Sequence, residues 1–542
     1  MADQFNACTY LVDRHVAAGR GAAPAVRSGE RTLAYAELSG AAAAVAQALK
    51  ATGVRPEERV MLLMVDGVEL LSAILGAMRM GAVAVPISTM LTARDLATLL
   101  RDSRARALLF SASFGPLVAQ AAPQAPDLAT AVVAGGAAPD LPSTVDVYGW
   151  DDFVAPGATR PGSPPDSTVD DSPALWLYTS GTTGTPKGAM HRHANFRHVV
   201  ECYADHILRL TSDDVCYSVA KLFFAYGLGN SAIFPLAAGA SAVLDPQRPT
   251  PASVVERLRA DHPTLFFATP SFYGALLSSD APADAFAGVR MAVSAGEPLP
   301  AQVFARFRDR YGVEIVDGLG STEALHIFLS NRPGDIRPGT TGTPVPGYDL
   351  ALRDADGGPV PDGQPGNLFV RGLSTATGYW CRVATTRAVF QGEWLRTGDV
   401  YTRSADGYYT CLGRSDDMLK AGGIWVSPAE VEGRLLEHPA VAQAAVVGVP
   451  DEHGIDKPIA YVVPVSGATI DPDELIVFAR AGLAAFKRPR RVFVADDLPR
   501  TATGKLRRFA VRELAIARLA AEAATGAAIP ALDADQIPMT SM

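Results

Sequence analysis

Nine residues in the first half of the chain have the composition of a phosphate-binding loop. The run from Ser180 to Gly188 reads Ser-Gly-Thr-Thr-Gly-Thr-Pro-Lys-Gly, with three glycines, four hydroxyl side chains and one lysine. Glycines allow tight turns that bring backbone N–H groups against an anion, and hydroxyls and a lysine are donors suited to phosphate oxygens. In the Walker loop, lysine and Ser/Thr directly follow the second glycine and open a helix. Here Pro186 precedes Lys187, so the run predicts a mobile flap over phosphates, with a Gly/Thr-rich surface turn as the alternative.

A hydroxyl, two carboxylates and a lysine later in the chain could act together on a phosphate ester. Thr322 and Glu323 follow a predicted strand and supply a hydroxyl donor and a hard oxygen ligand for a cation such as Mg²⁺. Asp399 could accept hydrogen bonds from two neighbouring hydroxyls, although a turn-forming aspartate is the alternative. Lys505 follows a Thr-Gly pair, so we expect it on a loop from which it can reach into a cleft. Its alternative is an exposed, solubilising lysine.

Alternating helix and strand patterns from about residue 30 must position these groups. Apolar residues at helical spacing predict helices at Leu38–Leu49 and Glu69–Met80. Near-continuous apolar strands separated by helices are typical of parallel sheets covered on both faces, which predicts an α/β fold. The expected strands are Val60–Met64, Ala82–Pro86, Ala107–Phe110, Leu175–Thr179, Ala242–Leu244, Leu265–Ala268, Met291–Ser294 and Glu314–Gly318.

The pattern changes after about residue 340. Short strands and Asp-Gly turns predict a small β-rich subdomain at about 340–415. Beyond it, Ser427, Pro428 and Glu430 have the spacing of a helix start, and the apolar strand Ala444–Val449 follows, which predicts a compact α+β unit. We therefore expect three parts in all, which are an N-terminal domain at 1–415, a C-terminal domain at 416–520 and a tail at 521–542.

Composition limits the partners that this protein can have. The 542 residues include 48 Lys and Arg against 57 Asp and Glu, a net charge of −9. A surface of that sign repels nucleic acid and anionic membrane, so we expect neither as a partner. The five cysteines are widely spaced without a CxxC, which argues against a disulfide framework or a zinc site. The chain start has no signal-peptide pattern and no 18-residue uncharged apolar run occurs, so the predicted location is cytoplasmic.

Five motifs resemble, in order, those of the adenylate-forming superfamily, which includes acyl- and aryl-CoA ligases. The first is the Ser180–Gly188 loop. The family fold that this resemblance implies has a large N-terminal domain of two parallel-rich αβαβα sheets plus a small β-barrel-like subdomain, followed by a small mobile α+β C-terminal domain. The other four motifs are Gly318-Leu319-Gly320-Ser321-Thr322-Glu323, Thr397-Gly398-Asp399, Gly413-Arg414-Ser415-Asp416-Asp417-Met418-Leu419-Lys420 and Pro499-Arg500-Thr501-Ala502-Thr503-Gly504-Lys505.

The resemblance implies a role for each group in condensing a carboxylate with ATP. Thr322 would bond the α-phosphate, Glu323 would bind Mg²⁺, and Asp399 would take both ribose hydroxyls with Arg414 nearby. Lys505 would bridge the substrate carboxylate and an ATP oxygen, so the implied catalytic residues are Lys505, Thr322 and Glu323. The implied ATP- and AMP-binding set is Thr179, Ser180, Gly181, Thr182, Thr183, Gly184, Lys187, Asp317, Gly318, Thr322, Asp399 and Arg414.

The same resemblance implies a second step with coenzyme A as co-substrate. Asp416 matches the hinge about which the C-terminal domain turns between an adenylating and a thioester-forming shape, and aspartate tolerates unusual backbone angles. An ordinary domain linker is the alternative. The small-residue segment just beyond it would line the tunnel for the pantetheine arm. The implied CoA-binding residues are Lys420, Gly422, Gly423 and Trp425.

Three segments look most like the benzoate-CoA ligase branch. They are Lys221–Asn230, Ser294–Glu297 and Gly320–Ile327. A tyrosine offers a flat apolar face with a polar tip, and small residues leave a slot for a planar ring. A structural aromatic core and a structural histidine are the alternatives. The aryl acid-binding residues that the resemblance implies are Ala225, Tyr226, Ala295, Gly320, His326 and Ile327.

The sequence therefore predicts an ATP-dependent ligase that activates benzoate or a substituted benzoate as acyl-AMP and passes the acyl group to coenzyme A. An enzyme of the same fold that loads a carrier-protein thiol is one alternative. A non-catalytic nucleotide sensor is an alternative of another class. A homodimer is one option for its assembly.

Overall fold

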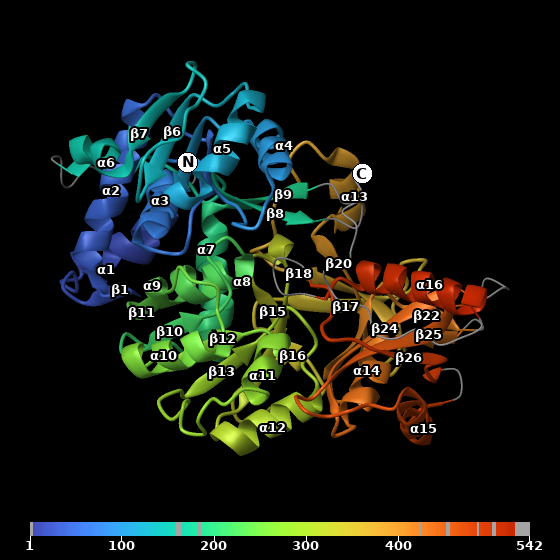
Figure 1. Ribbon diagram of the computed structural model, residues 1–542. Coiled ribbons are helices and arrows are strands. Elements are labelled where there is room, and N and C mark those ends of the chain that lie inside the picture. The colour runs from blue at the N-terminus through green and yellow to red at the C-terminus, as the bar shows by residue number, and fades with distance from the viewer. Residues whose placement is uncertain are drawn as a thin grey trace.

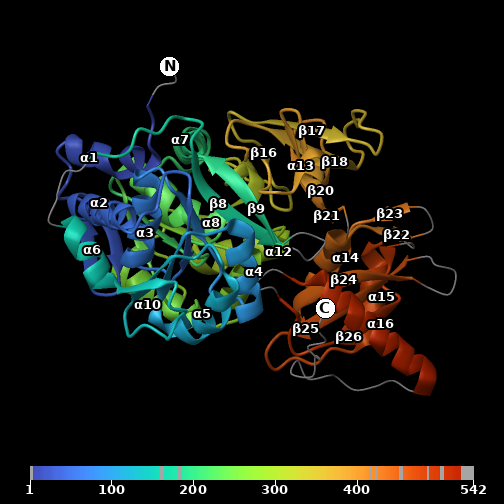
Figure 2. The same cartoon turned by 90° about the horizontal axis from the view of Figure 1, so that it is seen from above.

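The computed structural model describes residues 4–158, 164–180, 186–415, 417–421, 424–450, 456–484, 487–500 and 506–525. Figure 1 shows a large body, which holds residues 4–415, beside a small lobe, which holds residues 417–525. Seen from above in Figure 2, the small lobe stands to one side of the large body and next to the strands at 349–414.

The first sheet of the large body is a parallel array with one antiparallel edge strand. Within the described residues it has seven strands in the order β7-β6-β5-β3-β4-β8-β9, and only the β8–β9 pair is antiparallel. Strands β3 to β6 are almost wholly buried, as their continuous apolar sequence predicts. The strands are β3 (Arg59–Leu63), β4 (Val83–Pro86), β5 (Ala107–Ser111), β6 (Thr130–Ala134), β7 (Asp146–Gly149), β8 (Pro173–Ser180) and β9 (Pro186–Arg192). The helices along this part of the chain are α2 (Tyr35–Ala51), α3 (Val68–Arg79), α4 (Ala93–Ser103), α5 (Gly115–Ala121) and α6 (Trp150–Ala158).

The second sheet is also mainly parallel. Within the described residues it has nine strands in the order β16-β15-β14-β13-β12-β10-β11-β1-β2, with antiparallel strands at both edges. The strands are β1 (Pro24–Ser28), β2 (Arg31–Ala34), β10 (Val215–Ser218), β11 (Ser241–Leu244), β12 (Leu265–Ala268), β13 (Met291–Ser294), β14 (Ile315–Gly320), β15 (Ile327–Ser330) and β16 (Thr343–Pro344). The helices are α1 (Arg14–Ala17), α7 (His193–Val199), α8 (Ala225–Leu228), α9 (Phe234–Ala238), α10 (Pro251–Asp261), α11 (Pro270–Leu277) and α12 (Ala301–Tyr311).

Small residues let the helices of the large body pack closely. A Cβ on Gly76 of α3 would lie 2.6 Å from Val45 Cγ1 and 2.9 Å from the carbonyl oxygen of Ala42, both on α2. The alanine-rich sequence of α2 therefore serves close helix packing as well as helix propensity. One large apolar cluster contains residues of both sheets and of these helices, so the two sheets share a core.

The predicted β-rich subdomain forms a five-stranded antiparallel sheet among the described residues. Its three Asp-Gly turns hold Gly357, Gly363 and Gly407 at φ of 88°, 80° and 89°, a left-handed conformation that glycine adopts readily. Its elements are β17 (Asp349–Arg353), β18 (Gly366–Arg371), α13 (Val383–Val389), β19 (Phe390–Gln391), β20 (Trp394–Arg403) and β21 (Tyr409–Arg414).

The small lobe has its own α+β core. Ser427 caps α14 as predicted, because its hydroxyl accepts a hydrogen bond from the backbone N–H of Glu430. The last helix, α16, continues to Thr525, so the first five residues of the predicted tail are helical. The elements are β22 (Leu419–Ala421), β23 (Ile424–Val426), α14 (Pro428–Leu436), β24 (Val441–Pro450), β25 (Asp456–Pro464), α15 (Pro472–Gly482), β26 (Arg491–Val494) and α16 (Arg508–Thr525). No helix in the described part of the chain has both the length and the apolar character of a membrane span.

Candidate active site

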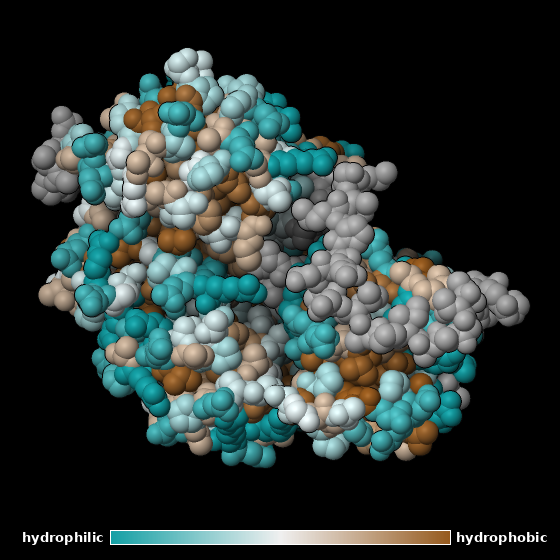
Figure 3. Space-filling view, viewed as in Figure 1, coloured by the Kyte–Doolittle hydropathy of each residue, from teal (hydrophilic) through white to brown (hydrophobic). Residues whose placement is uncertain are grey.

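A cleft of about 1980 Å³ lies where the two sheets, the β-rich subdomain and the small lobe meet. The space-filling view in Figure 3 is hollowed at this junction. Strands β8 and β14 end at the cleft, where crevices at the carboxyl ends of parallel strands commonly bind ligands. Residues predicted from the sequence that line it are Thr179, Lys187, Asp317, Gly318, Gly320, Thr322, Glu323, Asp399 and Arg414.

The Thr322–Glu323 pair lies on a tight turn directly after β14. Residues Thr322–Ala324 form one turn of 3-10 helix, and the Ser321 hydroxyl accepts a hydrogen bond of 3.1 Å from the N–H of Ala324. Leu325 then adopts φ of 66°, which is rare for a residue with a branched side chain. The backbone is thus bent sharply so that both functional side chains line the cleft.

His191 and Asn195, which the sequence analysis missed, hold this turn in place through hydrogen bonds. His191 Nε2 lies 2.9 Å from the carbonyl oxygen of Thr322, and Asn195 Nδ2 lies 2.9 Å from His191 Nδ1. Because the amide nitrogen can only donate, Nδ1 accepts and Nε2 carries the proton that binds Thr322. Burial lowers the pKa of His191 to about 4, so the ring is neutral at physiological pH. Asn195 itself is fixed by a second bond, 2.8 Å, to the carbonyl oxygen of Ser374.

Tyr379 is a third residue that the sequence analysis missed. Its hydroxyl donates a 2.6 Å hydrogen bond to Glu323 Oε1, and the N–H of Ala376 donates 2.7 Å to the Glu323 carbonyl oxygen. Burial and the neighbouring Glu323 carboxylate raise the pKa of Tyr379, so it stays a proton donor. Lys187 Nζ lies 5.4 Å from the centre of the same ring. The tyrosine therefore links the flap lysine to the predicted metal-binding carboxylate.

The donor set around Glu323 fits a magnesium ion that arrives with a nucleotide. The described residues contain no group of three or more His, Cys, Asp or Glu side chains that could hold a metal. Mg²⁺ commonly binds through one or two protein carboxylates together with substrate phosphates and water. A single carboxylate lining a cleft suits that mode.

Asp399 and Arg414 lie opposite each other on β20 and β21. Arg414 Nη1 donates to Asp399 Oδ1 at 3.0 Å and to the carbonyl oxygen of Thr397 at 3.1 Å. Gly398, which precedes Asp399 on β20, has φ of 80°, and a Cβ there would lie 2.8 Å from Arg414 Nη2. Glycine at this position thus leaves room for the ion pair, which holds the Asp399 carboxylate at the cleft.

Asp317, in β14, lines the cleft. Burial raises the pKa of this carboxyl well above its ordinary value. A buried carboxyl group in this state can donate a hydrogen bond as well as accept one.

Four of the six predicted acid-pocket residues, Tyr226, Gly320, His326 and Ile327, lie next to one another. Tyr226, on α8, donates 3.0 Å to the carbonyl oxygen of Val293 in β13, and its ring centre lies 5.6 Å from that of His326. Gly320 pairs with Ile327, and a Cβ on it would lie 2.6 Å from the His326 carbonyl oxygen. Burial lowers the pKa of His326 to about 3, so this ring is also neutral. Of the six residues, Gly320 is among those that line the cleft.

Several predicted site residues lie outside what the structure describes. The segment holding Lys505 begins after Arg500 and ends before Leu506, and these two residues pair as an antiparallel bridge and line the cleft. The residues outside the description are Gly181, Thr182, Thr183, Gly184, Asp416, Gly422, Gly423 and Lys505, together with the side chains of Ser180, Lys420 and Trp425.

Fold and cleft together define a nucleotide-dependent enzyme built from a large two-sheet body and a small lobe that borders the cleft. The chain belongs to the AMP-binding enzyme family, whose main domain matches residues 13–380 and whose C-terminal domain matches residues 430–505.

The names of several similar proteins describe them as CoA ligases of aromatic acids. A benzoate–CoA ligase of Thauera aromatica is 44% identical over 516 residues, which cover 94% of this chain and 96% of that protein. The crystal structure of a benzoate CoA ligase from Burkholderia xenovorans LB400 superposes with a TM-score of 0.86 at 42% identity, covering 94% of this chain and 100% of that one. The structure of the anthranilate CoA ligase AuaEII in complex with anthranoyl-AMP gives a TM-score of 0.90 at 38% identity, covering 95% and 98%. The predicted family and fold are thereby confirmed.

Proposed function

We propose that this protein activates benzoate or a substituted benzoate with ATP, releasing pyrophosphate, and then transfers the acyl group from acyl-AMP to coenzyme A, releasing AMP. The observation that carries the proposal is the convergence of Lys187, Thr322, Glu323, Asp399 and Arg414 on one cleft. The aromatic acid and the thiol acceptor, coenzyme A, are inferred from the names of similar proteins that cover nearly the whole chain.

Adenylation brings two anions together, so its transition state must be stabilised by cations and hydrogen-bond donors fixed in place. The Thr322 hydroxyl would bind the α-phosphate on a turn that His191 holds from below. Asp399, fixed by Arg414, would take the ribose hydroxyls. Lys505 would bridge the carboxylate and the α-phosphate, and the two residues flanking its segment lie at the cleft.

Mg²⁺ would be held by Glu323, with Tyr379 orienting the carboxylate through the Oε1 bond. The ion, when bound, supplies positive charge against the phosphate oxygens. In the acid pocket, neutral His326 and Tyr226 would enclose a planar ring with Ala225, Ala295, Gly320 and Ile327. Asp416 would be the hinge between the two domains. The residues that would bind coenzyme A are Lys420, Gly422, Gly423 and Trp425. The homodimer and the cytoplasmic location remain predictions from the sequence.

The test is ATP–pyrophosphate exchange with a panel of aryl and short aliphatic acids, followed by AMP release with and without free coenzyme A. Exchange with benzoates and faster AMP release on adding coenzyme A are expected. Exchange that coenzyme A does not accelerate would favour a carrier-protein thiol as acceptor. Soluble, folded protein that exchanges with no acid would favour a nucleotide sensor.

A further inference from the structure

An arginine of the small lobe crosses to the large body at the base of the Lys505 segment. Arg500 Nη1 lies 2.7 Å from Ser271 Oγ and 3.5 Å from Glu297 Oε1, and both partners belong to the large body. The other guanidinium nitrogen, Nη2, donates 2.6 Å to Gln443 Oε1 on β24 of the small lobe. The guanidinium is therefore held by Gln443 of the small lobe while it contacts Ser271 and Glu297 of the large body.

On the large body, the two partners of Arg500 are already held together by hydrogen bonds between Ser271 and Glu297. Gly296 adopts φ of 94°, and the turn that it makes carries Glu297 toward the first turn of α11. There Glu297 accepts hydrogen bonds from the N–H of Ser271, at 3.1 Å, and from the Ser271 hydroxyl. The Glu297 and Arg500 side chains are only 17% and 25% exposed, so water and salt screen their attraction incompletely.

Arg500 also fixes where the lysine segment starts and ends. Its backbone pairs with that of Leu506, so the two residues that flank positions 501–505 lie side by side at the cleft. Anchoring Arg500 to Ser271 and Glu297 thus anchors both ends of the chain that carries Lys505.

We infer that Arg500 is a positioning residue for adenylation. Through Glu297 and Ser271 it holds the small lobe in the orientation that delivers Lys505 to the ATP, and the contact must break before the lobe turns for thioester formation. This rests on the proposed function, since it assigns Arg500 to one of the two half-reactions. Neither nucleotide nor acid is required to touch Arg500.

The two half-reactions of the full-length protein test the inference. Acyl-AMP formation is followed by ATP–pyrophosphate exchange, and thioester formation by adding coenzyme A to benzoyl-AMP supplied directly. Loss of a charge-assisted bond predicts that Arg500→Ala lowers the kcat of exchange roughly 10- to 100-fold. The KM values for ATP and benzoate should change little, and thioester formation should stay at or above the wild-type rate. Arg500→Lys should recover part of the exchange activity.

Ser271→Ala provides a second, milder variant, because it removes one partner of Arg500 and leaves the bond from the Ser271 N–H to Glu297. In the double variant with Arg500→Ala, the fold loss in the kcat of exchange should be smaller than the product of the fold losses of the two single variants. Arg480→Ala, on the exposed side of α15, is the matched control and should leave both rates unchanged. Equal losses in both half-reactions, or unchanged exchange, would overturn the inference. Wild-type protein without exchange would instead refute the proposed function.

Discussion

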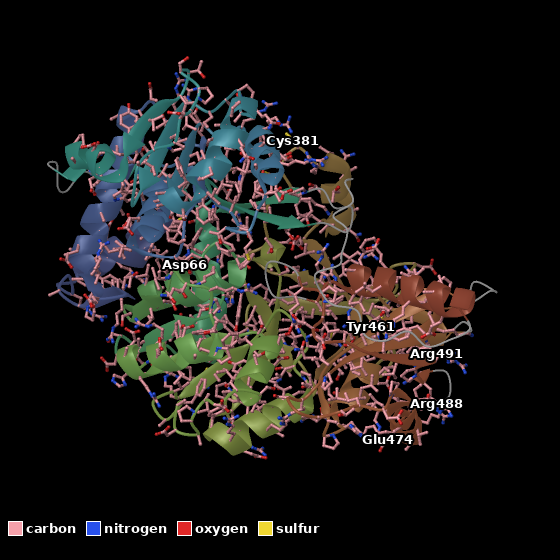
Figure 4. The ribbon with its side chains drawn as sticks, viewed as in Figure 1. Asp66, Cys381, Tyr461, Glu474, Arg488 and Arg491 are labelled. Atoms are coloured by element: carbon pink, nitrogen blue, oxygen red, sulfur yellow. The ribbon has the colours of Figure 1, made fainter. Side chains whose placement is uncertain are left out.

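Asp66 gives a prediction whose size follows from the structure. This carboxyl group lies inside the large body, away from the small lobe (Figure 4), and is 5% exposed. Its two oxygens accept the N–H of Leu222 at 3.1 and 3.2 Å. Burial raises its pKa from 3.8 to about 7, although Lys221 and the Leu222 N–H oppose the shift. Leu222 is the second residue of Lys221–Asn230, one of the three segments predicted to form the acid pocket.

The sign of the stability effect follows from this raised pKa. The folded state holds the Asp66 proton more tightly than the unfolded state, so this contribution is fully present below about pH 4 and is lost as the pH rises through 7. A shift of about three pKa units corresponds to about 4 kcal/mol. Asp66→Asn, which keeps an acceptor for Leu222 and cannot ionise, should therefore be close to wild type at pH 4, gain on wild type as the pH rises, and be more stable than wild type at pH 8, by at most about 4 kcal/mol.

Urea unfolding of wild type and variant at several pH values between 4 and 8, followed by tryptophan fluorescence, measures this difference. Asp214→Asn is the control of opposite sign, since hydrogen bonds from Arg290, Thr264 and the Thr211 N–H lower the Asp214 pKa despite its burial. Its carboxylate contributes stability above the ordinary carboxyl pKa, so Asp214→Asn should destabilise the protein at pH 7. A stability difference for Asp66→Asn that stays constant with pH, or that turns against the variant at pH 8, would refute the reasoning.

Three further outcomes concern the active site. Lys505→Ala should lower acyl-AMP formation by at least about 100-fold and leave thioester formation from supplied acyl-AMP largely intact; comparable losses in both would remove its role. Tyr379→Phe removes the bond to Glu323, and the Mg²⁺ concentration for half-maximal exchange should rise roughly tenfold; an unchanged Mg²⁺ dependence would contradict the orienting role. Gly320→Ala places a Cβ 2.6 Å from the His326 carbonyl oxygen, so stability should fall by about 1–3 kcal/mol and the KM for benzoate should rise more than that for ATP. Equal KM changes for benzoate and ATP would argue that Gly320 serves packing alone.

The buried strands could be predicted closely from the sequence. Leu265–Ala268 and Met291–Ser294 are observed with the predicted bounds, because a strand covered on both faces must be apolar at every position. Strand β2, at one edge of the second sheet, and its neighbour β1 were missed. Each has exposed and half-buried positions, so neither shows a continuous apolar run.

The functional groups could be predicted by type, but their partners could not. Thr322 and Glu323 were found through their chemistry and the resemblance of their motif. His191 and Tyr379 have no local pattern that points to the same turn, because they lie 131 and 56 positions away in sequence from the residues they bind. Only the folded chain brings them there.

That separation has a consequence for synthesis of the protein on the ribosome. Domains generally form in the order in which they emerge. Both sheets of the large body end by Pro344, whereas the side chain that orients Glu323 comes from Tyr379 and the carbonyl group that fixes Asn195 comes from Ser374. A nascent chain released after the second sheet would hold most of its core, but the predicted metal-binding carboxylate of Glu323 would still lack its Tyr379 partner. The active site is therefore expected to be completed after the core has become compact.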